Sequence, residues 1–180
     1  MLTQELLKRL ISYDPETGLL VWRARTPDLF KSGSGRYTAE RACKIWNIRY
    51  AGTQAGAMSD GYIIVSIFKR RYKAHRLAVF YMTGLWPAND VDHENLDRAA
   101  NDWNNLRDAT RSENNTNSTA QKHNKLGVKG VCQLKNGRYY VQIRKDGKTY
   151  YLGCFVKIED AIARHTTAAL ELHGKFARVN

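Results

Sequence analysis

Turn residues followed by an apolar run mark the first structured stretch of this chain. Residues 13–22 read YDPETGLLVW, so that Asp14-Pro15 and Gly18 precede a short series of apolar positions. Asp, Pro and Gly favour tight turns for separate conformational reasons, and a β-branched and aromatic run that follows them is typical of a strand. This stretch therefore predicts a turn that leads into a strand.

A second stretch changes from strand spacing to helix spacing. Residues 61–77 read GYIIVSIFKRRYKAHRL, a β-branched run followed by a basic turn. Apolar positions then continue at helical spacing at Leu77, Phe80 and Tyr81. Gly84 is a favourable helix end because glycine adopts a left-handed backbone without penalty. The pattern predicts strand, turn, short strand and helix.

The segment from Val91 to Asn114 combines strand, loop and helix signals. Val91-Asp92-His93 ends a short apolar run, a polar loop follows to residue 102, and residues 103–109 return as a strand. Thr110-Arg111-Ser112-Glu113 fits the S/T-x-x-E capping box that starts a helix. Asn114 falls on the first turn of that helix. We expect this order to bring Asp92, His93 and Asn114 toward one pocket.

The C-terminal third predicts a small sheet backed by a helix. Lys-Asn-Gly and Lys-Asp-Gly turns separate three strand-like runs, at residues 128–134, 138–144 and 148–155. Residues 158–172 carry much of an apolar stripe at helical spacing, closed by Gly174. Alternation in the middle strand places Gln142 and Arg144 on the face opposite Val141 and Ile143.

Composition narrows the partner classes. The formal net charge is +12, from 29 Lys and Arg against 17 Asp and Glu, which favours nucleic acid or an anionic membrane. Apolar runs fall far short of the about 20 residues that span a bilayer, and charges interrupt the N-terminal apolar pattern where a signal peptide would be continuous. We expect a cytoplasmic protein with no membrane partner. Residues 121–180 hold 12 Lys and Arg against 4 acids, which places most of the nucleic-acid affinity there.

Cysteine usage agrees with a reducing compartment. Cys43, Cys132 and Cys154 are odd in number and widely separated, and no C-x-x-C pair occurs. We expect reduced thiols and no structural zinc.

Acidic residues gather within this basic chain between Asp90 and Glu113. Phosphodiester hydrolysis needs a base for water and a cation that neutralises charge developing on the phosphate. His93 suits the first task. Asp92 and Asn114 offer the carboxylate and amide oxygens that suit magnesium, so a locally acidic metal site inside a basic DNA-binding protein accounts for both features.

These residues resemble an HNH nuclease of the phage and intron homing-endonuclease type. The matching pieces are A-H-R-L-A at 74–78, V-D-H at 91–93, N-N-L-R at 104–107 and T-R-S-E-N-N at 110–115. The resemblance implies that His93 is the general base and that Asn105 supports the loop that carries it. It also implies that Asp92 and Asn114 hold one divalent metal, magnesium or alternatively manganese.

Further DNA contacts are expected near this motif. The candidates are His75, Arg76 and Arg107. His75 is equally well interpreted as a packing residue at the head of its helix. The basic run at 69–73 is interpreted either as a solvent-exposed hairpin tip or, because it lies next to that helix, as a phosphate contact. The loop acids Asp97, Asp102 and Asp108 are interpreted as turn or solvent-facing residues.

The C-terminal pattern resembles the plant-type ethylene-response-factor (Apetala-type) DNA-binding domain, whose mobile-element relatives occur fused to HNH nucleases. The pieces that carry the resemblance include Lys129-Gly130-Val131, Gln142-Ile143-Arg144, Tyr151-Leu152-Gly153 and Glu159-Asp160-Ala161. It implies that the sheet enters the major groove, with Lys129, Gln142, Arg144 and Tyr151 as base or phosphate contacts. Cys132 and Leu134 stand where the plant family often has arginine, so the plant target sequence does not transfer. The alternative is a plain α+β module whose tyrosines are cross-strand pairs.

Together the patterns predict a two-domain α+β protein. A ββα-metal HNH nuclease domain spans residues 1–118, a linker 119–126, and an ethylene-response-factor-like domain 127–180, in which a three-stranded antiparallel sheet packs on one helix. The expected activity is metal-dependent cleavage of double-stranded DNA, by a monomer rather than a dimer because the motif occurs once. If a phage encodes it, the location is the host-cell cytoplasm.

Two other functions stay open. One is a DNA-binding regulator without catalysis, against which the intact Asp92, His93, Asn105 and Asn114 argue. The other is a restriction or packaging nuclease of a phage, which shares the chemistry and differs in target. Residues 26–50 carry no motif and are interpreted as a DNA-clasping insertion or as a loop with a short helix.

Overall fold

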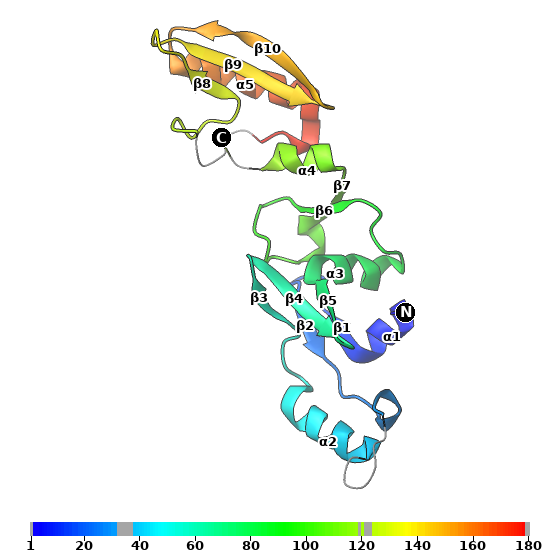
Figure 1. Ribbon diagram of the computed structural model, residues 1–180. Helices are drawn as coiled ribbons and strands as arrows, with labels where there is room; N and C mark the ends of the chain where they lie inside the picture. Colours follow the sequence, from blue (N-terminus) through cyan, green and yellow to red (C-terminus); the bar gives the residue numbers. More distant parts are fainter. Residues whose placement is uncertain (1, 32–37, 119, 121–123, 179–180) are drawn as a thin grey trace. The chain divides into compact units, whose positions relative to one another are not determined.

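The chain divides into two compact units, Met1–Asp108 and Ala109–Asn180. The computed structural model (Figure 1) describes residues 2–31, 38–118, 120 and 124–178. Both units mix helices with small antiparallel sheets, as the α+β prediction expected. The boundary between the units falls within strand β7, Leu106–Ala109. It lies upstream of residue 118, where the predicted nuclease domain ends. The predicted linker lies partly outside the described residues, and the predicted domain limits stay a prediction.

The first unit contains three small sheets and three α-helices among its described residues. Its sheets pair β1 with β2, order β3-β4-β5, and pair β6 with β7. The elements are α1 Gln4–Leu10, β1 Ile11–Tyr13, β2 Leu20–Trp22, a 3-10 turn η1 Pro27–Leu29, α2 Ala39–Tyr50, β3 Ala57–Ser59, β4 Tyr62–Ile67, β5 Arg70–Lys73, α3 Ala74–Thr83, β6 Asp90–His93, η2 Trp103–Asn105 and β7 Leu106–Ala109.

The predicted strand, turn, short strand and helix of residues 61–84 are confirmed. β4 pairs with β5 so that Ile67 faces Arg70, which leaves Phe68 and Lys69 as a two-residue loop. Both have positive φ, 48° and 65°, because two-residue hairpin loops need left-handed residues to match the twist of the strands. α3 ends at Gly84 with φ 76°.

The core of the first unit joins α1, the hairpins and α3. Fully buried side chains from these elements include Leu7, Leu10, Ile11, Val65, Ile67 and Leu77. Burial of aliphatic side chains contributes about 25 cal/mol for each Å² removed from water. This core therefore holds α3 and the β4–β5 hairpin in fixed positions relative to each other.

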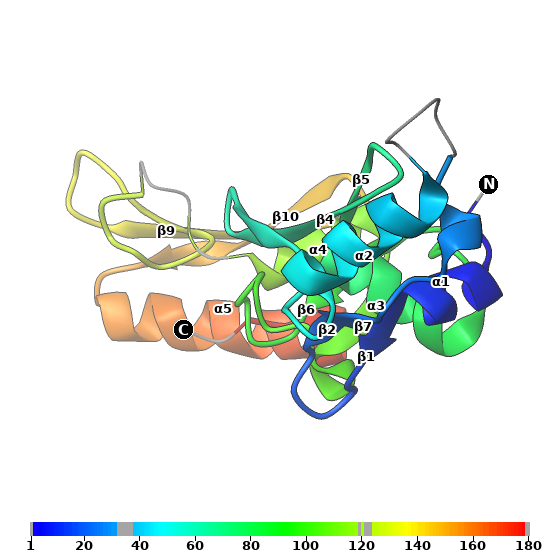
Figure 2. The same ribbon diagram turned by 90° about the horizontal axis from the view of Figure 1, so that it is seen from below.

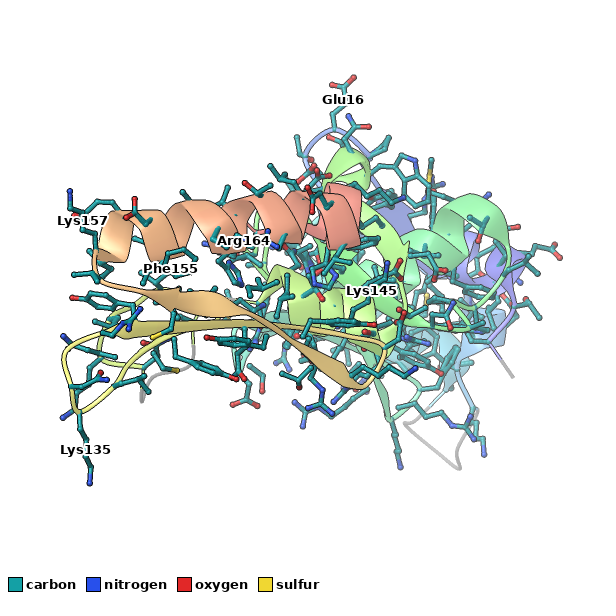
Figure 3. All side chains as sticks on the ribbon, turned by 90° about the horizontal axis from the view of Figure 1, so that it is seen from above. Glu16, Lys135, Lys145, Phe155, Lys157 and Arg164 are labelled. Carbon is teal, nitrogen blue, oxygen red and sulfur yellow. The ribbon has the colours of Figure 1, made fainter. Side chains whose placement is uncertain are left out.

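In the second unit, an antiparallel sheet packs on one long helix. The sheet order is β10-β9-β8, and α5 runs along one side of β9 and β10 (Figure 2). Its elements are α4 Arg111–Asn117, β8 Val131–Gln133, β9 Tyr139–Lys145, β10 Lys148–Phe155, α5 Ile158–His173 and η3 Gly174–Phe176. Figure 3 shows Phe155 between sheet and helix, and Lys135 pointing away from the unit.

Two predicted strands are shorter than expected. Residues 103–105 form η2, because the Asp102 side chain accepts a hydrogen bond from the main-chain N–H of Asn105 and turns the chain before β7 begins. The first strand of the second unit starts at Val131 instead of residue 128. The amide of Asn124 donates to the Val128 carbonyl and holds that stretch in a turn.

Candidate active site

Asp92 and His93 are the last residues of β6 and point into the protein. Val91, Asp92 and His93 are all buried, with Asp92 4% and His93 5% exposed. β6 pairs with β7, and the N–H of Glu94 donates to the carbonyl of Asn105 across this ribbon at 2.9 Å. The ribbon therefore holds both side chains in place at the start of the loop.

Asn105 clamps the loop that follows His93. Its Oδ1 accepts a hydrogen bond from the N–H of Asn95 at 2.9 Å, and its Nδ2 donates to the carbonyl of Ala100 at 2.8 Å. One buried side chain thus satisfies main-chain groups at both ends of the loop. This is the geometry that a loop-supporting asparagine requires, although its role in cleavage stays a prediction.

His93 lies against a second histidine. The ring centroids of His75 and His93 are 4.8 Å apart, and the two ring planes are nearly perpendicular. Asn101 Oδ1 lies 3.4 Å from His93 Nε2. Burial lowers the pKa of His93 below its usual value, and Arg98 acts in the same direction, while Asn101 and Asp92 oppose the shift. A neutral imidazole is the form that accepts a proton from water.

His75 is a buried residue at the head of α3. It is 4% exposed, and burial, followed by His93, lowers its pKa to about 3. Its Nδ1 makes no hydrogen bond within the described part of the chain, and its ring contacts Tyr62 at 5.3 Å between centroids. The structure therefore places His75 beside the candidate base as a neutral ring; a contact with DNA stays a prediction.

No motif in the sequence singles out Asn101 or Tyr62. Asn101 is 3% exposed, and its carbonyl accepts a hydrogen bond from the Tyr13 hydroxyl at 2.8 Å. Gly18 packs so closely on this loop that an added Cβ would lie 2.3 Å from the Asn101 carbonyl carbon. No sequence spacing relates Tyr13 or Gly18 to Asn101, so only the fold reveals that the first hairpin supports the loop.

Arg107 pairs with Asp92. Its Nε and Nη2 both lie 2.9 Å from Asp92 Oδ2, and its Nη1 lies 3.8 Å from a Glu94 oxygen. Arg76, the other arginine predicted to contact DNA near the motif, donates to the carbonyls of Pro87 and Asn89. Both guanidinium groups therefore make contacts inside the first unit, and their predicted DNA contacts stay predictions.

The loop acids make local hydrogen bonds. Asp97 Oδ1 accepts from the N–H of Ala99, Asp102 caps η2, and Asp108 Oδ2 accepts from the Asn89 amide. This agrees with their interpretation as turn or solvent-facing acids.

Asn114 lies in the second unit, on α4. The predicted capping box is confirmed, because the Thr110 hydroxyl accepts from the N–H of Glu113 and the Glu113 carboxylate accepts from the N–H of Thr110. The box starts α4 at Arg111 and puts Asn114 in its first turn. The pairing of Asn114 with Asp92 stays a prediction.

The donor types of Asp92 and Asn114 fit a hard divalent cation. A carboxylate has about four lone-pair sites on two oxygens, and an amide carbonyl oxygen is a second hard acceptor. Among the described residues, no three His, Cys, Asp or Glu side chains form a metal-binding group. The predicted pair of one carboxylate and one amide has fewer protein ligands than such a group, as magnesium accepts because it retains several waters; this metal site stays a prediction.

Three of the four DNA-contact candidates in the second unit share one surface. In β9, Val141 and Ile143 are buried, whereas Arg144 is exposed and Gln142 is partly so. Tyr151 faces Gln142 on β10, is 60% exposed and stacks on Tyr140 with ring centroids 5.0 Å apart. Their shared face is opposite the one that packs on α5.

Lys129 is the exception. Its ammonium group donates to the carbonyls of Asn115, Thr116 and Ser118 at 2.9, 2.6 and 3.0 Å, which are acceptors at the end of α4. Burial lowers its pKa to about 8. In this arrangement Lys129 stabilises α4, and its predicted contact with DNA stays a prediction.

Residues 72–116 match the family model described as HNH endonuclease. The matched range includes His75, Asp92, His93, Asn105 and Asn114, and it agrees with an HNH endonuclease domain in this part of the chain. Residues 127–180 lie outside it. No curated protein matches the chain. Among the described residues, no helix has the length and apolar character needed to cross a membrane.

Proposed function

We propose that this chain is a metal-dependent HNH endonuclease that hydrolyses phosphodiester bonds in double-stranded DNA. The observation that carries the proposal is the position of His93. It is buried beside His75 at the end of β6, on the ribbon that also holds Asp92, inside the range that matches the HNH family model.

His93 is the base in this proposal. Its lowered pKa leaves the imidazole neutral near pH 7, so that it takes a proton from the water that attacks phosphorus. Asn105 holds the loop after His93 and thereby keeps the ring in position. A divalent cation on Asp92 and Asn114 would supply positive charge to the leaving 3′-oxygen.

We further propose that the sheet of the second unit binds DNA. Gln142, Arg144 and Tyr151 share the face opposite the one that packs on α5, and residues 121–180 hold 12 Lys and Arg against 4 acids. Arginine and glutamine on a sheet surface can contact base edges, each with about 1–3 kcal/mol of discrimination. The homing-type biology of a phage or intron nuclease is part of the same proposal and rests on the resemblance of the motif.

The decisive experiment incubates supercoiled plasmid with the full chain, in magnesium or in EDTA. Cleavage in magnesium that disappears in EDTA is expected, and His93→Ala is expected to slow it by about 10²–10⁴-fold. His173→Ala, in the second unit, serves as the matched control and should cut like the wild type. The product form separates nicking from double-strand cleavage.

Two results would contradict the proposal. Full cleavage by His93→Ala would remove His93 as the base. A wild-type protein that binds the plasmid and leaves it intact in both magnesium and manganese would support a DNA-binding regulator instead.

A further inference from the structure

Tyr62 is the centre of a cluster in which two cations and two histidines lie near one aromatic ring. Lys73 Nζ lies 3.9 Å from the centre of the Tyr62 ring, and the guanidinium carbon of Arg98 lies 5.1 Å from it. The His75 and His93 rings lie 5.3 and 6.3 Å away. Both cations and the candidate base therefore lie near the same aromatic ring.

Three separate elements build this cluster. Tyr62 begins β4, Lys73 ends β5 directly before α3, and Arg98 lies in the loop after β6. The β4–β5 register places Lys73 opposite Ile64, which brings it alongside the start of β4. The side-chain stem of Arg98 passes over Gly61, where an added Cβ would lie 3.7 Å from Arg98 Cδ.

Lys73 and Arg98 are exposed cations whose polar groups have no hydrogen-bonding partner among the described residues. Both residues are exposed. Within the described part of the chain, neither side chain forms a hydrogen bond or an ion pair, and their contacts are with the Tyr62 ring. In contrast, Arg107 and Arg76, which also lie near the motif, donate to groups of the first unit. Lys73 and Arg98 keep their N–H donors for a ligand.

A phosphodiester is the ligand class that fits such a pair. The guanidinium group presents a planar fork that matches two phosphate oxygens, and lysine adds a compact charge. Contact with an aromatic face restricts where each cation can move and so reduces the ordering needed on binding. The charge of two nearby cations suits the repeated single negative charges of a DNA backbone.

We propose that Lys73 and Arg98, held by Tyr62, bind backbone phosphates of the DNA strand beside His93. The proposal rests on the endonuclease function and deepens it, because it assigns the groups that hold the strand next to the base. Tyr62 is a positioning residue in this site, and Lys73 and Arg98 contact the substrate.

The test uses the full chain and two measurements. The affinity of the protein for a fluorescent DNA duplex is measured over a series of salt concentrations. EDTA is present throughout, so that no metal-dependent cutting occurs. Each phosphate contact contributes about 0.9 to the slope of log affinity against log salt. Arg98→Ala and Lys73→Ala are each expected to reduce the slope by about that amount. On plasmid in magnesium, each should raise KM on the order of tenfold, more than it lowers kcat.

Matched variants separate binding from fold stability. Lys8 lies 5.2 Å from the ring of Tyr81 and is an exposed cation of the same unit, so Lys8→Ala should leave slope and KM unchanged. Arg98→Lys should retain the slope, because the charge is kept. Tyr62→Phe keeps the ring and should behave like the wild type, whereas Tyr62→Leu should raise KM.

Failure of the proposed phosphate site and failure of the proposed nuclease activity give different results. If the wild type cuts DNA and both alanine variants keep the wild-type slope and KM, the phosphate site is wrong and the nuclease stands. If the wild type does not cut, the nuclease is wrong, and the slopes in EDTA still decide whether Lys73 and Arg98 bind phosphate. Because both residues are exposed, their variants remain informative even if Tyr62→Leu unfolds.

Discussion

The hydroxyl of Tyr13 donates a 2.8 Å hydrogen bond to the main-chain carbonyl of Asn101, a residue 88 positions further along the chain. The same Asn101 places its side-chain oxygen 3.4 Å from His93 Nε2. The N–H of Trp103 also donates to the carbonyl of Pro15. The N-terminal hairpin is thus a structural support of the loop that surrounds the candidate base.

Removing the Tyr13 hydroxyl should loosen this support. Tyr13→Phe is expected to lower the free energy of unfolding of the first unit by about 1–2 kcal/mol, because a buried carbonyl loses its donor. All four tryptophans lie before residue 109, so urea unfolding followed by tryptophan fluorescence reports on this unit. Tyr81→Phe is the control, since the Tyr81 hydroxyl makes no hydrogen bond within the described residues. Equal stability of both variants would contradict the interpretation.

Asn105 and Asn104 offer a matched pair of neighbouring asparagines. Asn105→Ala removes both clamps of the loop and should lower kcat by about a hundredfold, because displacement of a catalytic group by about 1 Å has that effect. DNA affinity in EDTA should change little. Asn104 is exposed, and Asn104→Ala should keep the wild-type rate. Asn105→Asp retains the acceptor for the Asn95 N–H and should recover part of the activity; a rate equal to that of Asn105→Ala would argue against the clamp.

Burial of His75 predicts a pH-dependent stability. Its pKa is about 3 in the folded protein and about 6.5 in an unfolded chain, so the unfolded state binds the extra proton between these values. Stability is therefore complete above pH 6.5 and falls as the pH decreases toward 3. Between pH 7 and pH 5 this one group should lower the free energy of unfolding by about 2 kcal/mol.

The measurement compares urea unfolding at the two pH values by tryptophan fluorescence. In His75→Asn the loss between pH 7 and pH 5 should be smaller by about 2 kcal/mol. His173→Asn, which changes a histidine of the second unit, should retain the wild-type pH dependence of this signal. If His75→Asn and the wild type lose stability equally, His75 is not held neutral by burial.

Gly130 is confined between β9 and α5. An added Cβ would lie 2.4 Å from the Gln142 carbonyl oxygen and 2.4 Å from the His165 ring, and its φ is +72°. Gly130→Ala is expected to destabilise the second unit by about 3 kcal/mol or more, through strain and displaced backbone. Gly137 has a similar φ of +83° with open space around it, so Gly137→Ala should cost only about 1–2 kcal/mol. Hydrogen exchange of the β9 amides measures both, and equal costs would contradict the packing argument.

Substitution of Lys129 distinguishes a structural role of this side chain from a contact with DNA. Lys129→Met removes the donor to three carbonyls at the end of α4 and should lower the stability of the second unit by about 2 kcal/mol. The salt slope of DNA binding should stay at the wild-type value. A slope reduced by about 0.9 would favour the phosphate contact that the resemblance predicts. Lys157→Met, at the exposed start of α5 (Figure 3), is the control for loss of one charge.

The order and type of the elements near the motif could be predicted because their signals are local. Gly84 ends α3, the Thr110 and Glu113 capping box starts α4, and two Gly-containing turns separate the strands of the second unit, each through contacts within a few residues. Alternation in β9 likewise predicted that Val141 and Ile143 share one face, opposite Gln142 and Arg144, since strand side chains alternate between faces. The structure buries both of them. The limits of β7 and β8 were wrong because the side chains of Asp102 and Asn124 form turns that compete with the strands.

The sequence by itself therefore determined which chemical groups are present: a histidine beside a carboxylate, asparagines at the motif spacing, and a strongly basic last third. Only the tertiary structure decided which groups surround the histidine. The rings of His75 and Tyr62 lie near His93, and Lys73 and Arg98 lie near the Tyr62 ring, all from separate elements. Tyr13 forms a hydrogen bond with Asn101, which lies 88 positions further along the chain. Such contacts depend on how the hairpins and α3 pack over a shared core, and no periodicity along the chain encodes a distance between residues far apart in sequence.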